Sequence, residues 1–262
     1  MLDMHSHLLY GVDDGPKTME QSIEMLKQAQ KEGITDIIAT SHVCHPQYHV
    51  TSTQVVQQVQ QLQQTIDQLG IALTIHTGHE VRMTDRLLDM LEKKEVLPLG
   101  NSHYVLLELP SSNVPKYTKD LIVLLKAQGM TPIIAHPERN KAIAEKPERL
   151  ERLIREGAVA QITAGSLAGH FGQSIQALSL DLVKANLVHT YGSDAHNLTT
   201  RPFLYDEGLC YLEKKKQLDA VDLLLENNAR IIEDKSFIVY EPESIAKKKW
   251  WQFFKSLKLH NL

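Results

Sequence analysis

Cysteine and long apolar runs are what this sequence has least of. Two cysteines in 262 residues, Cys44 and Cys210, cannot form a disulfide framework, so we expect a reducing, cytoplasmic setting. No apolar run approaches the roughly 20 residues that span a bilayer, and the first residues do not resemble a signal peptide. The net charge of −4 lacks the basic excess typical of nucleic-acid-binding proteins.

Histidine, in contrast, is abundant, with 13 residues in the chain. The opening stretch, MLDMHSHLLYGVDDG, already places His5 and His7 two positions apart in a strand-like segment. Such residues point to the same side of a strand. Burying two imidazoles together is costly unless something binds them.

Short apolar segments alternate with longer amphipathic ones along the whole chain, without a linker rich in proline, glycine or serine. This alternation predicts one parallel α/β unit. Polar residues at nearly every strand end favour a closed (β/α)7 TIM-like barrel over an open sheet. Thr18 and Gln21 predict a capping box, and the glycine-rich stretch 165–172 predicts a loop with tight turns. The expected strands are 1–5, 34–40, 72–77, 104–109, 132–135, 159–163 and 187–191, and the expected helices are 18–33, 52–69, 85–94, 116–128, 146–156, 172–185 and 218–233.

Potential metal ligands follow six of these strands. In a parallel barrel the carboxyl ends of the strands meet at one rim, so we expect these side chains to converge there. Histidine nitrogens mixed with carboxylates suit zinc, manganese or iron. Nine candidates are too many for one ion but enough for two or three. They are His5, His7, Asp14, His42, Glu80, Glu108, His136, Asp194 and His196.

Nearby polar residues are expected to have other roles. We expect Asp13 to be a turn or cap residue and Asp14 to be a ligand, although the two could have each other's role. Asp3 has the same parity as His5 and His7, so it could orient a ligating imidazole from behind or hydrogen-bond inside the barrel. The pleat of a strand directs His79 away from the side that Glu80 faces.

Two arginines accompany the candidate ligands. Arg139 follows His136 by three residues, and Arg201 follows His196 by five. A planar guanidinium pairs well with phosphate oxygens. Although each arginine alone could be a surface ion-pair partner, the two together favour a phosphate-bearing substrate.

A cysteine-based phosphatase mechanism is excluded by the sequence. That mechanism needs the pattern Cys-x5-Arg, but the sixth residue after Cys44 is Val50 and the sixth after Cys210 is Lys216. We therefore expect direct attack by a metal-bound hydroxide, without a covalent intermediate.

Taken together, the motifs H-x-H, D-D-G, T-S-H, GHE, LLELP, AHPERN, GSLAG.FG and SDAHN resemble the PHP (polymerase and histidinol phosphatase) superfamily, and within it the CpsB/CapC type of bacterial protein-tyrosine phosphatase. The resemblance covers about residues 1–235. It implies a distorted seven-stranded barrel with three divalent ions, often manganese. It also implies a phosphotyrosine substrate on a bacterial tyrosine kinase that controls capsule or exopolysaccharide synthesis.

Carried over residue by residue, the resemblance implies the same nine ligands, with Arg139 and Arg201 holding the phosphate. One departure is Val43, where many relatives have a second histidine after the one that matches His42. The loop 43–50 could therefore shape access of the substrate differently. Tyr48 in this loop could face an aromatic substrate or be an ordinary loop residue.

The C-terminal segment 247–259, KKKWWQFFKSLKL, differs in composition from the rest of the chain. We expect a barrel at 1–240 and a basic, aromatic tail at 241–262. A basic amphipathic helix with aromatic residues suits the inner face of a membrane, but it equally suits docking on a partner or on the barrel itself.

Other functions remain open from the sequence. The same centre could hydrolyse a small phosphomonoester such as histidinol phosphate, or act on a nucleic-acid end. An amidohydrolase barrel also begins with H-x-H, but it usually has a lysine at the fourth strand, where Glu108 stands here, and the Asp194-x-His196 pair also departs from it. A non-catalytic regulator that binds the kinase would not need the full set of ligands and arginines.

Overall fold

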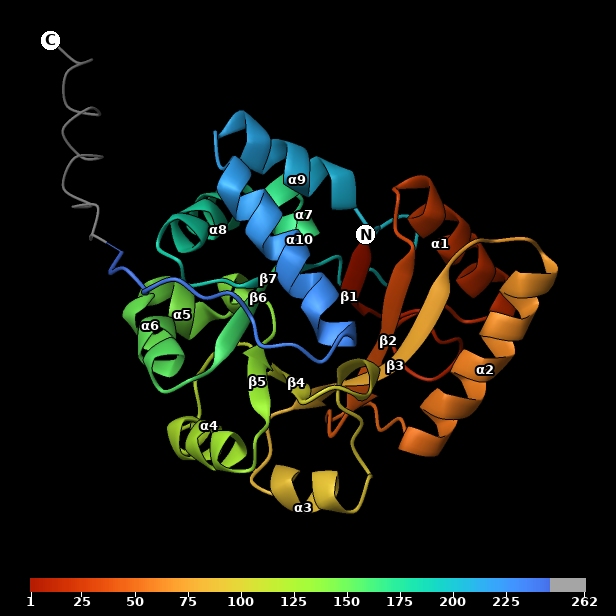
Figure 1. Ribbon diagram of the computed structural model, residues 1–262, viewed down its shortest axis with the longest axis horizontal. Coiled ribbons are helices and arrows are strands. Elements are labelled where there is room, and N and C mark those ends of the chain that lie inside the picture. Colours follow the sequence, from red (N-terminus) through yellow and green to blue (C-terminus); the bar gives the residue numbers. More distant parts are fainter. Residues whose placement is uncertain (246–262) are drawn as a thin grey trace, which may run out of the picture.

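A computed structural model describes residues 1–245 of the chain. The basic segment 247–259, for which the sequence predicts membrane or partner contact, lies outside the described residues. Within residues 1–245, seven parallel strands follow one another in chain order around the sheet (Figure 1). The strands are β1 (Leu2–Ser6), β2 (Asp36–Val43), β3 (Thr74–Arg82), β4 (Tyr104–Glu108), β5 (Thr131–Ile134), β6 (Val159–Thr163) and β7 (Thr190–Gly192).

The sheet curls until β1 and β7 meet. Ser6 and Ala195 form a parallel bridge, and the amide of His7 donates to the carbonyl of Ala195 at 2.9 Å. The result is the nearly closed, TIM-like α/β barrel that the alternating pattern predicts.

Helices cover the outside of the barrel (Figure 1). The α-helices are α1 (Met19–Lys31), α2 (Ser52–Gln68), α3 (Leu87–Glu92), α4 (Thr118–Ala127), α5 (Lys141–Glu145), α6 (Glu148–Arg155), α7 (Ala164–Ala168), α8 (Gln173–Lys184), α9 (Tyr205–Lys214) and α10 (Leu218–Ile232), and the short 3₁₀ helices are η1 (Leu99–Asn101) and η2 (Pro137–Arg139).

Buried apolar side chains form two clusters. The larger one lies between the strands and the surrounding helices. The smaller one draws residues such as Met4, Ile38 and Leu106 from alternating strand positions and includes Leu99 of η1 and Ile231 of α10. The lower part of the barrel is thus filled with side chains, as in other small barrels. Space for a polar site remains at the carboxyl ends of the strands.

Two helix starts show how local sequence sets the elements. Thr51 and Gln54 form a complete capping box at α2. At α1, Thr18 accepts from the amide of Gln21 at 3.4 Å, but the Gln21 side chain accepts from the amide of Lys17, not from that of Thr18. The capping box predicted at α1 is therefore only half present, since Lys17 supplies the second donor.

The glycine-rich stretch 165–172 is not a loop throughout, contrary to the prediction. It begins within α7, because Thr163 caps that helix by accepting from the amide of Ser166 at 3.4 Å. The helix ends at Gly169, whose φ of 86° is left-handed. Short helices of this kind carry too few residues to show a helical period.

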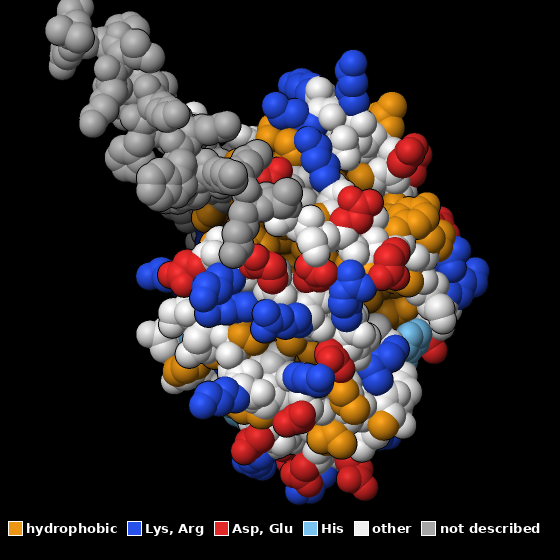
Figure 2. Space-filling model, turned by 90° about the vertical axis from the view of Figure 1, so that its left-hand side faces the viewer, with side chains coloured by type: hydrophobic (Ala, Val, Ile, Leu, Met, Phe, Trp, Pro, Cys, Tyr) orange, Lys and Arg blue, Asp and Glu red, His pale blue; other side chains and the backbone are white. Residues whose placement is uncertain are grey.

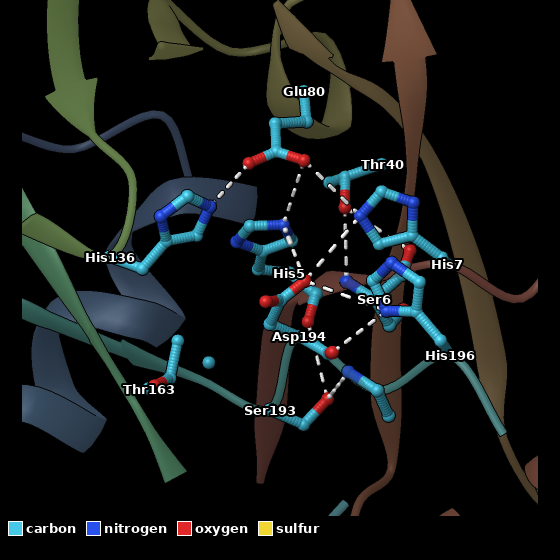
Figure 3. Close-up of polar contacts among 12 residues, drawn as sticks. His5, Ser6, His7, Thr40, Glu80, His136, Thr163, Ser193, Asp194 and His196 are labelled. Atoms are coloured by element: carbon cyan, nitrogen blue, oxygen red, sulfur yellow. Dashed lines mark hydrogen bonds and ion pairs between the residues drawn. The ribbon is translucent and has the colours of Figure 1, made fainter. Parts of the chain in front are cut away.

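Strand β1 is irregular, which matters for the site. Its register with β2 shifts between Asp3 and Ser6. Within this interval, Met4 belongs to the cluster inside the barrel. His5, the next residue, and His7 both point into the site (Figure 3). A shift of one residue reverses which face a side chain occupies, so parity counted from His5 does not extend to Asp3.

Within residues 1–245, no helix is long and apolar enough to cross a bilayer. On the side that carries α6 and α8, acidic and basic side chains are interspersed without a broad field of one sign (Figure 2).

Candidate metal centre

All nine side chains predicted as ligands meet at the carboxyl ends of the strands. They form four overlapping groups whose ligand atoms lie within 4.8 Å of one another. The groups are His7 with Asp14, His42 and His196; His5 with His7 and Glu80; His5 with His136 and Asp194; and His42 with Glu80 and Glu108.

Glu80 contacts several imidazoles of the cluster, and Figure 3 shows its lines to His5, His7 and His136. One of its carboxylate oxygens lies 2.8 Å from Nε2 of His136. The other lies 3.2 Å from Nε2 of His7, 3.1 Å from Nδ1 of His42 and 3.5 Å from Nε2 of His5. A carboxylate placed among four imidazoles can bridge neighbouring cations.

Asp194 is the second central carboxylate. Its Oδ1 lies 3.3 Å from Nε2 of His5 and 3.5 Å from Nε2 of His7. Its Oδ2 accepts from both predicted arginines, from Arg201 at 2.7 Å and from Arg139. The arginines therefore stand directly beside the candidate ligands, as their spacing in the sequence suggests.

The backbone is bent sharply at two of these positions. His136 has a φ of 32° and Asp194 a φ of 53°, both in the left-handed region of backbone conformation that residues other than glycine seldom adopt. Gly192 allows β7 to approach β1, because a Cβ there would lie 2.9 Å from Cβ of His5. Unusual backbone conformations of this kind gather at functional sites.

Several buried atoms of the cluster have no hydrogen-bond partner among the described residues. An unpaired buried polar atom costs about 1–3 kcal/mol, so such a gathering calls for a ligand. Nitrogen and carboxylate donors left bare on facing side chains fit divalent cations. The bare atoms are Nε2 of His5, His7 and His196, Nδ1 of His42, Oδ1 of Asp14 and Asp194, and Oε2 of Glu108.

The charges in the centre support one another. Burial would raise the pKa of Asp194, but Arg139 and Arg201 outweigh it and hold that pKa well below its usual range. Burial likewise opposes ionisation of Glu80, yet His5 and His42 lower its pKa. Both carboxylates are therefore ionised, as metal ligands must be.

Two residues orient the imidazoles from behind, and the sequence did not single them out for this role. Asp13 accepts from Nδ1 of His7 at 3.0 Å and from the amide of His42 at 3.2 Å. Gln161 places its Oε1 3.2 Å from Nδ1 of His5 and accepts from the amide of His136 at 3.2 Å. Burial raises the pKa of Asp13, but His7 lowers it to about 2 overall. The prediction of a mere turn residue at Asp13 was too limited, because its side chain reaches across to the cluster.

Asp3 and His79 lie outside the cluster. Asp3 accepts from the hydroxyl of Ser193 at 2.5 Å and from its amide at 2.9 Å, which joins β1 to the end of β7. Asp3 therefore does not orient a ligating imidazole, which was one of the two roles that the sequence left open; its hydrogen bonds go to Ser193 and to the amide of His5. His79 faces away from the site, as parity predicts, and its Nδ1 accepts from the amide of Leu97 at 3.0 Å.

Two further contacts were not anticipated. Arg82 pairs with Oε1 of Glu108 at 2.9 Å, so only the second oxygen of Glu108 is bare. The Arg139 guanidinium lies 5.2 Å from the ring centroid of Phe171, a cation–π contact. The motif containing Phe171 is conspicuous in the sequence, but its contact depends on how the loop after α7 folds back.

Comparisons with known proteins agree with this geometry. The sequence model of the family "Capsular polysaccharide synthesis, CpsB/CapC" matches residues 1–233. CapC of Staphylococcus aureus is 39% identical over 251 residues, 96% of this chain and 98% of that protein. Tyrosine-protein phosphatase YwqE of Bacillus subtilis is 38% identical over 254 residues, 97% of this chain and 100% of that protein.

A solved structure is equally similar. It is one of the crystal structures of YwqE from Bacillus subtilis and CpsB from Streptococcus pneumoniae, which are described as unique metal-dependent tyrosine phosphatases. Its TM-score is 0.92 at 38% identity, and the match covers 94% of this chain and 100% of that one.

Proposed function

The chain belongs to the CpsB/CapC family, and from its rim of histidines and carboxylates we propose that it is a metal-dependent protein-tyrosine phosphatase acting in capsule or exopolysaccharide synthesis. The observation that carries this proposal is the convergence of nine ligand-type side chains with two arginines at one end of the barrel. Relatives named as tyrosine phosphatases match over nearly their whole length.

We propose His5, His7, Asp14, His42, Glu80, Glu108, His136, Asp194 and His196 as ligands of two to three divalent ions, with manganese first and iron, zinc or magnesium as alternatives. When bound, such ions lower the pKa of a water molecule and neutralise charge on phosphate oxygens. Four overlapping donor groups that share Glu80, His5, His7 and His42 support more than one ion.

Arg139 and Arg201 are proposed to hold the phosphate. Both reach Oδ2 of Asp194 from the open side of the cluster, and their side chains are 19% and 30% exposed, enough to meet a ligand. A guanidinium offers five N–H donors, so each arginine can retain Asp194 and still donate to phosphate. As charge builds up on the phosphoryl oxygens, these fixed cations stabilise it.

A cavity of about 310 Å³ opens onto the cluster. Its wall combines Asp14, His42 and His136 with both arginines, and it also includes His45, Leu109, Ser111 and Asn140. Such a volume accommodates a phosphorylated side chain, and the opening to the surface lets a protein substrate present it.

The decisive experiment compares turnover of a tyrosine-phosphorylated peptide with turnover of histidinol phosphate by the purified protein. We expect the protein to turn over the peptide faster and to lose activity when a chelator is added. Thiol alkylation should have no effect, because Cys44 and Cys210 lie outside the cluster. Preference for histidinol phosphate would favour the small-molecule alternative, and full activity without metal would contradict the centre.

The partner and the place of action are proposed from the family and from the sequence. A bacterial tyrosine kinase of the capsule system is the proposed phosphoprotein substrate, at the inner face of the cytoplasmic membrane. Contact with that membrane through residues 247–259 stays a prediction, as does the division into a barrel at 1–240 and a tail at 241–262. Deleting 247–262 and measuring binding to anionic liposomes tests the membrane contact, which unchanged binding would refute.

A further inference from the structure

Three rings lie in near-parallel planes at the mouth of the site. The centroids of His42 and His45 are 4.7 Å apart with a 19° angle between the rings. Those of His45 and Tyr48 are 5.3 Å apart at 17°, and those of His42 and Tyr48 are 5.8 Å apart at 7°. His42 belongs to the candidate metal centre, whereas the other two rings extend outward from it along the loop after β2.

The loop that carries these rings is held at several points. Cys44 turns the chain with a φ of 61°, and its Sγ lies 3.5 Å from the sulfur of Met90. The amide of Val50 donates to the carbonyl of His42 at 3.0 Å and closes the loop. Within it, the amide of Gln47 donates to Nδ1 of His45 at 3.2 Å and fixes that ring. The position of the rings is therefore set before a substrate arrives.

His45 also borders the cavity that contains Arg139 and Arg201. A phosphate held by the arginines would leave the rest of this cavity to its organic group. There the group meets the ring of His45, against which the ring of Tyr48 packs, and Leu109 and Ala135 are also part of the wall. A planar face of this kind packs well against another planar ring, with centroids typically 4.5–7 Å apart.

On these grounds we propose that His45, with the ring of Tyr48 packed against it, forms the subsite for the phenyl ring of phosphotyrosine and so selects aryl over alkyl phosphates. This inference rests on the proposed function and deepens it. The two rings are specificity-determining residues, since neither belongs to the groups that could hold a metal. Tyr48 would then support the ring of His45 that faces the aromatic substrate.

The test compares two non-hydrolysable inhibitors, phenylphosphonate and methylphosphonate, on the metal-loaded wild type and on variants. Loss of an aromatic pair costs about 0.5–1.5 kcal/mol beyond area burial, and 1.4 kcal/mol is a factor of ten. The double variant His45→Ala/Tyr48→Ala should therefore raise the inhibition constant of phenylphosphonate about tenfold. That of methylphosphonate should stay within about twofold.

Matched controls separate ring packing from loop damage. Tyr48→Phe keeps the ring and should behave as wild type. His49→Ala changes an exposed residue of the same loop outside the three-ring set and should affect neither inhibitor. Equal loss for both phosphonates, or no loss for either, would overturn the proposal. If the wild type fails to hydrolyse a phosphotyrosine peptide, the proposed function fails, while the inhibition constants still decide whether a ring subsite exists.

Discussion

His7 and His189 are both buried, with exposed fractions of 0% and 2%, but they lie at opposite ends of the barrel. His7 follows β1, and its Nε2 faces Glu80 and Asp194. His189 precedes β7, and its Nδ1 accepts from the amide of Ala160 at 3.2 Å. Burial alone thus does not distinguish a ligand from a packed imidazole; the groups that face its nitrogens do.

The pKa values of the two imidazoles differ in the same way. Burial lowers the pKa of His189 to about 4, with no carboxylate to oppose it. At His7 burial also acts downward, but Asp13 and Glu80 outweigh it and raise the pKa well above its usual value. The carboxylates around His7 therefore favour a positive charge at that position, whereas burial disfavours one at His189.

Removing the central carboxylate should have the largest effect. Glu80→Gln keeps the shape but takes the charge from among four imidazoles, so fewer ions should be held. Loss of residues that merely support metal ligands costs about 10–100-fold, so we expect kcat/KM to fall by at least about 100-fold. Glu20→Gln on the exposed side of α1 is the control, and a Glu80 variant that matched it would disprove the central role of Glu80.

Removing a phosphate-holding arginine should have the next largest effect. Arg139→Ala should mainly raise KM. The fall in kcat/KM should correspond to about 2–4 kcal/mol of lost transition-state stabilisation, the cost of losing one charged donor. Steady-state kinetics on a phosphotyrosine peptide checks this. Arg155, which pairs with Glu241 at the surface at 2.7 Å, provides the matched control as Arg155→Ala. An unchanged kcat/KM for the Arg139 variant would remove Arg139 from the site.

A supporting residue should matter less. Asp13→Asn keeps the size of the side chain but weakens its hold on His7 and His42, so metal affinity should drop about 10–100-fold. The drop is measured by titrating metal into chelator-treated protein. Excess metal should restore most of the activity, which distinguishes a positioning role from a catalytic one. Wild-type affinity would show that Asp13 is only a turn residue.

Changing the imidazole at the opposite end should leave activity at neutral pH unchanged and act on acid stability instead. The unfolded chain protonates His189 near pH 6.5, whereas the folded chain resists until about pH 4. The stability is therefore complete above pH 6.5 and is lost as the pH falls toward 4. That loss is about 3 kcal/mol.

His189→Asn should therefore flatten the fall of the free energy of unfolding between these pH values, measured by urea denaturation. Asparagine provides an acceptor for the Ala160 amide but does not titrate. An equally steep acid loss in the variant would refute this account of His189.

The sequence predicts the cluster well for a simple physical reason. In a parallel barrel, a residue at or just beyond the carboxyl end of a strand lies at the same rim, so the positions of Glu80, His136 and Asp194 relative to the strands predict that they converge. The roles of Asp13 and Gln161 were missed because they depend on loop conformation and on contacts between distant strands. The parity that sequence reasoning gave to Asp3, the same as that of His5 and His7, failed because the register of β1 shifts between Asp3 and Ser6.

Some helices escaped prediction for local reasons. Helix α9 starts after Leu204, which has a φ of 51° and no capping side chain, so no start signal is visible. Helix α5 has five residues, too few for a period, although Asn140 caps it by accepting from the amide of Ile143 at 3.0 Å. Long amphipathic helices such as α2 appeared at nearly their predicted bounds.

The most direct test of the metal centre is calorimetric titration of chelator-treated protein with manganese. The account predicts two or three ions per wild-type chain, and fewer in Glu80→Gln and His136→Ala variants that remain folded by circular dichroism. No more than one ion in the wild type, or wild-type stoichiometry in both variants, would contradict the claim that these side chains form one centre for several cations.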